Sequence, residues 1–497
     1  MKIDCMKKIL LLFMFLIGKL GSYAQTIKYS EPQDFNVAKD LFEIGGWVDD
    51  RLMIFYTQKN ESFIDLYDQN MVRKAIVSLS FMPEKPKQIK LVPMDDKIML
   101  LYSAMTGSKE FYYAALLDKQ GKLIGKPKNL DEQQQNFLGY TKIRYQFVVS
   151  EHNQKMALFG YQIKDNKLQY HINIVDNDLN ISSSSSGKVD CKNAMEVEQA
   201  LIKDDGTLVL NINDLNSSHN QSIGEAAIYT IKPVAKNKSE AQVFPFELQG
   251  KFLSGLYIKD DLAKANNLYF AAFYMSRSNG IIEGSYLGNV AIDGSTNGLT
   301  NGAATPFDVS LLESYKGKDQ KLLNDYRIKD IIVKNDGGVI LAAEAFYSFT
   351  RTTSNGMYNG YSSMGFGGMG MNNSSYTEYN YGNILILDFK PNYETNWFNM
   401  INKNQRTTDD YGTYSSYNML NSGAQLVFTY NNIQRNGIKL QVAALDMEGS
   451  LTEKDIAATM KSNGLWLPKL SVQTDNKELV IPVVKSNKKM SFAKLSY

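Results

Sequence analysis

A short polar turn followed by an apolar run recurs along the whole chain. Each turn is rich in Asp, Asn or Gly, and each run is aliphatic, β-branched or aromatic. Because Asp, Asn and Gly tolerate the positive φ angles of tight hairpins, each copy predicts a hairpin turn and the strand after it. The eight copies are VDDRLMIFY from Val48, MDDKIMLLY from Met94, EHNQKMALF from Glu151, KDDGTLVLN from Lys203, KDDLAKANNLYFAA from Lys259, KNDGGVILAA from Lys334, LNSGAQLVF from Leu420 and QTDNKELVI from Gln473.

A second marker follows most copies one strand later. It is an apolar strand that ends in Asp, often before a turn with Gly, and in the fourth unit it is degenerate (AIYTIKPVAK from Ala227). The repeating unit is therefore strand, turn, strand, loop, strand, turn, strand. Many strands are apolar on both faces, which indicates sheets packed between neighbouring sheets. The clear copies are IDLYDQN from Ile64, ALLDKQGKL from Ala115, INIVDNDLN from Ile172, VAIDGST from Val290, ILILDFKPN from Ile384 and VAALDMEGS from Val442.

In this repeat the chain resembles the β-propeller superfamily, and it looks most like uncharacterised secreted propellers of Gram-negative bacterial envelopes. The resemblance implies an all-β fold with four-stranded antiparallel blades over a single domain, residues 25–497. Eight blades are expected, and seven are the alternative if one unit is distorted. No characterised subfamily matches, because the blades lack a Trp-Asp ending, a recurring double Gly of the kelch type and a sialidase Asp-box. No active site can be carried over.

The two ends of the chain are expected to meet. The last unit has only three strands, LWLPKLSVQT, ELVIPVVKS and KMSFAKLSY, before Tyr497. The extended segment Thr26–Ser30 belongs to no other unit, so we expect it to supply the outer strand of the last blade. Such closure removes an open sheet edge. A short helix is expected within Leu311–Tyr326, between two units.

Residues 1–24 have the parts of a secretory signal: a basic pair, the apolar run Ile9–Ile17 and a small-x-small cleavage site before Gln25. We therefore expect export through a Sec-type signal to the periplasm, the envelope or the medium. No transmembrane anchor is expected after cleavage, since the run is shorter than the roughly 18 residues that span a bilayer. Cleavage leaves Cys191 as the only cysteine, which excludes an internal disulfide and predicts a packed, buried thiol.

Charge and motifs exclude several classes of function. The formal net charge is +2 and becomes slightly negative without the signal, which argues against a nucleic-acid partner. His152, His171 and His219 have no zinc or serine-hydrolase spacing, and HExxH, GxSxG and phosphate-loop motifs are absent. The most calcium-like cluster, Asp176 and Asp178 in DNDLN, lacks the alternating donors of a calcium loop, and we interpret it as a hairpin turn. No catalytic residue, metal or cofactor is predicted.

One segment departs from the repeat, residues 351–381, between the second and third strands of the sixth unit. It is rich in Gly, Ser and Asn, and its aromatic and thioether side chains suit adaptable recognition. The alternatives are an insertion without a role and a copper(I) site of methionine sulfurs. The candidate partner-binding residues are Met357, Tyr358, Tyr361, Met364, Phe366, Met369, Met371, Tyr376 and Tyr379.

Three functions stay open on this basis. The leading hypothesis is a non-enzymatic exported binding or scaffold protein for a protein or glycan of unknown identity, which follows mainly from the fold. The second is a carbohydrate-active enzyme, a glycoside hydrolase or lyase, which would need two or three carboxylates with aromatic walls at the central mouth of the propeller. The third is a structural component of an envelope assembly.

Overall fold

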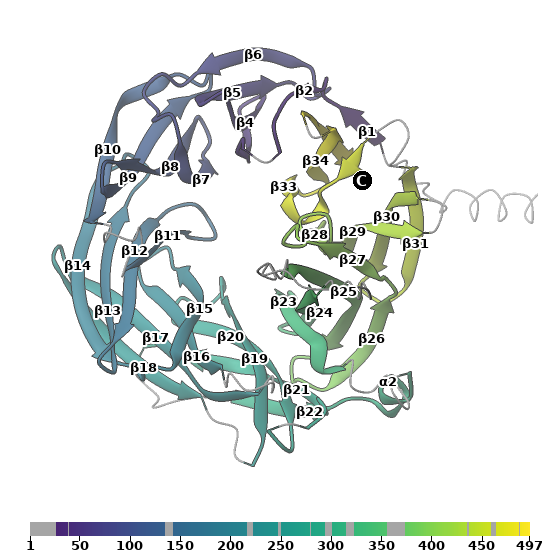
Figure 1. The fold of residues 1–497 in the computed structure, drawn as a ribbon. Helices are drawn as coiled ribbons and strands as arrows, with labels where there is room; N and C mark the ends of the chain where they lie inside the picture. The colour runs from purple at the N-terminus through teal and green to yellow at the C-terminus, as the bar shows by residue number, and fades with distance from the viewer. Residues whose placement is uncertain are drawn as a thin grey trace, which may run out of the picture.

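The chain forms a ring of antiparallel sheets that follow one another in chain order, as the computed structural model shows (Figure 1). The expected all-β propeller with four-stranded blades is confirmed. The expected signal and its cleavage point at Gln25 lie outside the described residues. The structure describes residues 26–37, 39–134, 143–215, 222–246, 250–278, 280–293, 301–314, 323–354, 373–434, 437–458, 464–486 and 488–497.

The first three blades are four-stranded meanders in which each strand pairs with the next. Their first strands lie innermost in the ring (Figure 1). The strands are β3 (Phe42–Val48), β4 (Arg51–Gln58), β5 (Glu61–Tyr67) and β6 (Arg73–Ser78); β7 (Pro86–Pro93), β8 (Lys97–Thr106), β9 (Lys109–Asp118) and β10 (Leu123–Gln134); and β11 (Arg144–Val149), β12 (Met156–Lys164), β13 (Lys167–Val175) and β14 (Ile181–Asp190).

The next sheet has eight strands, yet it consists of two four-stranded meanders joined by a single residue pair, Ile223 with Leu253. Helix α2 (Val309–Ser314) follows it; a short helix was expected within Leu311–Tyr326, and α2 overlaps the start of that range and begins two residues before it. The strands are β15 (Met195–Ile202), β16 (Leu208–Leu215), β17 (Ile223–Ala235) and β18 (Lys238–Phe246), then β19 (Phe252–Asp260), β20 (Asn267–Met275), β21 (Gly284–Ala291) and β22 (Asn301–Pro306).

Two further blades and the closing blade complete the ring. The first contains β23 (Tyr326–Val333), β24 (Val339–Ser354), β25 (Asn373–Phe389) and β26 (Thr395–Ile401), with β27 (Gln405–Thr408) added to β25; the second contains β28 (Tyr417–Asn421), β29 (Gln425–Gln434), β30 (Gly437–Asp446) and β31 (Leu451–Ala458); the last contains β32 (Leu465–Trp466), the 3-10 turn η2 (Pro468–Leu470), β33 (Val472–Asp475), β34 (Glu478–Ser486) and β35 (Lys489–Ser496).

The N-terminal strand closes the ring, as predicted. Strand β1 (Thr26–Tyr29) pairs antiparallel with β35 and is the outer strand of the last blade (Figure 1). The ring of Tyr29 lies 5.7 Å from that of Trp466, which is fully buried. Strand β2 (Gln33–Asp34) pairs with the start of β35.

The core lies between neighbouring sheets, as strands apolar on both faces require. Phe55 of β4 and Leu100 of β8 belong to one buried cluster shared by the first two blades. Each is fully buried. Adjacent sheets therefore hold each other by burial of apolar area, at about 25 cal/mol per Å².

The second sequence marker has a structural role in the turn between the third and fourth strands. Asp68, Asp118, Asp176 and Asp446 each accept two backbone N–H bonds, from the residues two and four positions later, over 2.7–3.1 Å. A carboxylate in this position stabilises the turn, because it accepts hydrogen bonds from backbone N–H groups that the backbone itself does not pair. The DNDLN segment is thus a hairpin turn, with Asp176 as its acceptor.

The alternation of strand direction gives the ring two unlike faces. We call the side with the turns between first and second and between third and fourth strands the turn face. We call the other side, with the connections between second and third strands and between blades, the loop face. Among the helices of the described part of the chain, none combines the length and the apolar character needed to span a bilayer.

Candidate functional site

The segment singled out in the sequence begins and ends in a long hairpin on the loop face. Tyr376 and Tyr379 lie on β25 and are partly exposed. Strands β24 and β25 stay paired beyond the blade, from Phe346 opposite Tyr381 to Ser354 opposite Asn373. The other seven candidates lie outside the described residues: Met357, Tyr358, Tyr361, Met364, Phe366, Met369 and Met371.

Strand β27 widens this hairpin to three strands, since Tyr379 pairs with Thr407. We call residues 346–354, 373–381 and 405–408 the extension. Tyr347 on it is 44% exposed, and its ring stacks on that of Phe349 at 6.2 Å. Tyr411, which follows β27, is 80% exposed and lies 6.1 Å from the ring of Tyr379. Exposed tyrosines of this kind give a partner rigid contact area with a polar tip.

A buried ion pair supports the base of the extension. Lys403 Nζ lies 2.6 Å from Glu344 Oε1, and both side chains are fully buried. Ser416 donates to the other carboxylate oxygen at 2.6 Å, and Lys403 donates to Gln405 Oε1 at 3.0 Å. Burial lowers the pKa of Lys403, and the charge of Glu344 opposes that shift. No sequence signal marks this pair.

Tyr381 connects the pair to the neighbouring blade. Its hydroxyl accepts a hydrogen bond from Lys469 Nζ at 3.4 Å, and Lys403 Nζ lies 5.8 Å from the centre of its ring. Burial raises the pKa of Tyr381 to about 12, so the phenol stays protonated at neutral pH. The site beneath the extension is therefore a fixed polar support for it.

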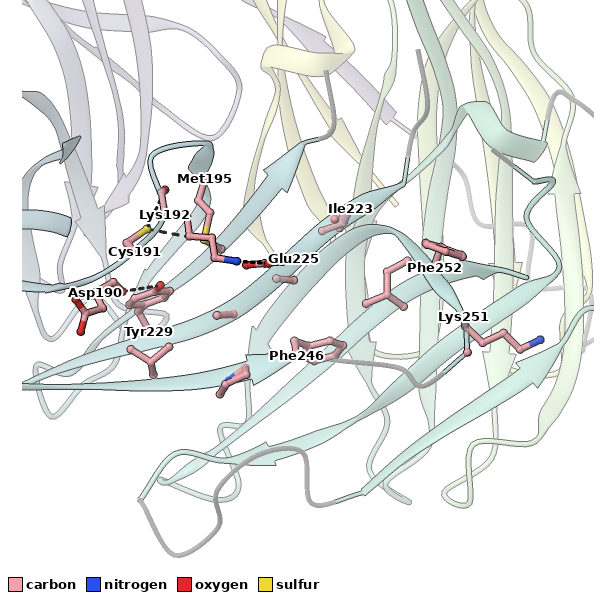
Figure 2. Close-up of a pocket in the computed structure, with 17 residues that line it drawn as sticks. Asp190, Cys191, Lys192, Met195, Ile223, Glu225, Tyr229, Phe246, Lys251 and Phe252 are labelled. Atoms are coloured by element: carbon pink, nitrogen blue, oxygen red, sulfur yellow. Dashed lines mark hydrogen bonds and ion pairs between the residues drawn. The ribbon is translucent and has the colours of Figure 1, made fainter. Parts of the chain in front are cut away.

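A pocket of about 750 Å³ opens elsewhere on the loop face, between the two halves of the eight-stranded sheet (Figure 2). We call it the interblade pocket. Polar groups that line it already have partners within the protein. Lys192 forms an ion pair with Glu225, and Tyr229 Oη donates a hydrogen bond to the carbonyl of Asp190 at 3.0 Å. Phe252, 40% exposed, adds an apolar wall. The pocket therefore suits an apolar group of a partner.

Cys191 lines the interblade pocket but packs as the sequence predicted. It is 4% exposed, and burial raises the pKa of its thiol. Its Sγ lies 4.0 Å from Met195 Sδ. Since the thiolate is the reactive form, this cysteine is a packing residue.

Two carboxylates meet at one lysine inside the ring. Lys259 Nζ on the inner strand β19 lies 3.1 Å from Glu151 Oε1 and 4.0 Å from Asp330 Oδ1. Burial raises the pKa of Asp330, and Lys259 lowers it. Burial raises the pKa of Tyr257, and the charges of Asp330 and Glu151 raise it further. The carbohydrate-active enzyme hypothesis needs carboxylates beside aromatic rings that can act as general acid and base. Here the positive charge of Lys259 already neutralises part of the charge of these carboxylates.

A second inner-strand pair gives a prediction for pH. Glu43 of β3 faces Lys90 of β7, and burial raises the pKa of Glu43 from 4.5 to about 7 against the opposing charge of Lys90. Between those values the unfolded chain releases a proton that the folded chain retains, so this group lowers stability as pH rises. Glu43→Gln should therefore stabilise the protein above pH 7 and have little effect near pH 4. Urea unfolding of both proteins at pH 4, 6 and 8 tests this; an equal difference at all three would contradict it.

The histidines have ordinary partners. His152 Nδ1 lies 2.6 Å from Asp204 Oδ2 in the neighbouring blade, and His171 Nδ1 lies 2.6 Å from Ser186 Oγ. His219 lies outside the described residues. Among the residues described, no group of three or more His, Cys, Asp or Glu side chains is placed to hold a metal ion.

Comparison with known proteins gives likeness in fold only. No family model matches the chain, and no curated protein sequence matches it. Similar solved structures include prolyl oligopeptidase B from Galerina marginata (8% identity, TM-score 0.42, 90% of this chain and 55% of that one). They also include an oligogalacturonate lyase in complex with manganese (11% identity, TM-score 0.37, 83% of this chain and 97% of that one). A third is the Nup133 β-propeller domain of Vanderwaltozyma polyspora (9% identity, TM-score 0.37, 82% of this chain and 100% of that one). The chain spans about half the length of the oligopeptidase, and at these levels of similarity no activity is assigned to it.

Proposed function

We propose that the chain is an exported, non-enzymatic propeller that binds a protein or glycan partner through its loop face. The observation that carries the proposal is the concentration of recognition features on that face. Two pockets, of about 750 Å³ and about 900 Å³, lie there, together with the extension and the exposed tyrosines on it and just after it. The proposed place of action is the periplasm, the envelope or the medium, as the signal in residues 1–24 implies.

We also propose that the ring has eight blades, with the eight-stranded sheet counted as two. Packing supports this count. Val209 and Ile228 of the first half share a buried cluster with Ile258 and Phe270 of the second half. The two halves thus meet face to face, as neighbouring blades do. They share only one pair of backbone partners, whereas two adjacent strands of one continuous sheet would be paired along their length.

Two exposed tyrosines, Tyr347 on the extension and Tyr411 just after β27, provide the test of the binding proposal. Tyr347→Ser/Tyr411→Ser removes two exposed rings without touching the core. Buried interface tyrosines often contribute more than 1 kcal/mol each, so recovery of the partner from an envelope extract should fall roughly tenfold or more. Recovery on immobilised wild-type and variant protein, quantified for proteins and for sugars, is the measurement.

A matched control keeps the test specific to one face. Val72→Ser/Leu262→Ser removes two apolar side chains that are 51% and 53% exposed, both on the turn face. This control should recover the partner as wild type does. Loss of recovery in the control, with full recovery by the tyrosine variant, would overturn the assignment to the loop face. Equal recovery by all three proteins would favour a structural component held by other surfaces.

A further inference from the structure

A second pocket on the loop face lies where the ring closes. It has a volume of about 900 Å³ and is lined by four separate parts of the chain. These are residues 34–36 and 39–41 at the end of β2 and after it, the hairpin between β4 and β5 at 57–60, the start of β7 with the two residues before it at 84–88, and Lys488 between β34 and β35. We call it the lysine pocket.

Unpaired positive charge distinguishes the lysine pocket. None of its five lysines forms an ion pair within the described part of the chain, whereas Lys192 and Lys251 of the interblade pocket both do. A lysine without a carboxylate partner keeps its full charge available to a ligand. Since the whole chain is close to neutral, this is a local concentration of charge. The five are Lys39, Lys59, Lys85, Lys87 and Lys488.

Hydrogen bonds hold the walls of the pocket in place. The backbone N–H of Phe35 donates to the carbonyl of Lys488 at 2.8 Å, and that of Leu41 donates to Thr57 Oγ1 at 2.8 Å. Asp40 accepts from the backbone N–H of Asn36 at 2.7 Å. The shape therefore exists before a ligand arrives, which reduces the entropy cost of binding.

The remaining lining groups narrow the class of ligand. Asp34 and Glu84 accept hydrogen bonds, and the side-chain amides of Asn60 and Gln88 both donate and accept. A ligand with anionic groups alone would be repelled by the three carboxylates that line the pocket, Asp34, Asp40 and Glu84. A ligand that combines carboxylates with hydroxyl groups satisfies both sets, because its hydroxyls can donate to Asp34 and Glu84 while its carboxylates meet the lysines.

We propose that the lysine pocket binds an acidic glycan, a polymer of uronic-acid sugars. This inference rests on the proposed binding function and names a ligand class for one part of the same face. Exposed lysines give a long-range attraction that salt screens, so binding should weaken as ionic strength rises.

The test uses an alginate hexamer as the probe, titrated calorimetrically into the full protein without its signal. Wild type should bind the hexamer, and Lys59→Gln/Lys87→Gln should bind it roughly tenfold more weakly or worse. Lys264→Gln/Lys477→Gln removes the same charge from exposed positions on the turn face and should bind as wild type does. Absence of binding by wild type, or equal binding by all three, would overturn the proposal.

Two further probes separate the ligand classes. A neutral glucose hexamer should not bind, and hexaglutamate should bind at least tenfold more weakly than alginate. Hexaglutamate binding as tight as that of alginate would make the pocket an acidic-peptide site and would overturn the glycan assignment. The variant Tyr347→Ser/Tyr411→Ser should retain alginate binding, so failure at the lysine pocket is distinguishable from failure of the extension to recognise its partner.

Discussion

Lys403→Met should lower the free energy of unfolding by about 3–5 kcal/mol, because it leaves the fully buried Glu344 carboxylate without its cation. Two other groups, Ser416 and Gln405, are arranged around this pair and cannot replace the lost charge. Urea unfolding at pH 7, followed by tryptophan fluorescence, measures the loss. The effect is large because the charge cannot reach water without opening the contact between two blades.

A double variant separates the loss of charge from the loss of packing. Glu344→Leu/Lys403→Met removes both charges, so most of the stability should return. If the single variant unfolds at the same urea concentration as wild type, the pair does not support the base of the extension. If the double variant is as unstable as the single one, packing around Lys403 is the dominant contribution.

Removal of the closing strand should have the second large effect. A protein that begins at Glu31 lacks all four backbone pairs between β1 and β35 and exposes Trp466, on which Tyr29 packs. Loss of the apolar contacts of Ile27 and Tyr29 should cost about 3–6 kcal/mol. The uncovered edge of β35 should also promote self-association. Thermal melting and size-exclusion chromatography over a range of concentrations measure the two effects.

A substitution within β1 is the control for closure. Lys28 donates to Asn70 Oδ1 at 2.7 Å on the surface, and Lys28→Gln keeps the strand and its pairs. This variant should melt within about 0.5 kcal/mol of wild type, as surface changes usually do. A truncated protein that melts and elutes like the full one would contradict the role of β1 in closing the ring.

The sequence by itself determined the blade and its closure. The repeated turns work through local chemistry: Asp49 and Asn153 adopt φ of 56° and 57°, and Gly206 adopts 88°. Asp118 fixes its own hairpin through hydrogen bonds to residues two and four positions away. Interactions between residues two to four positions apart depend only on a short stretch of sequence, so the sequence is enough to predict them. The missing fourth strand of the last blade then left Thr26–Ser30 as the segment to complete it.

Only the tertiary structure decided which side chains form sites. Glu344 of β24 meets Lys403, which follows β26, and Glu151 meets Lys259 of another sheet, 108 residues away along the chain. The lysine pocket draws on segments from the two ends of the chain, brought together by ring closure. Such contacts depend on how whole sheets pack against one another, and packing imposes no spacing on the residues that it brings together. The physical reason is range: turns are specified by neighbours in sequence, whereas sites on a closed ring are specified by neighbours in space.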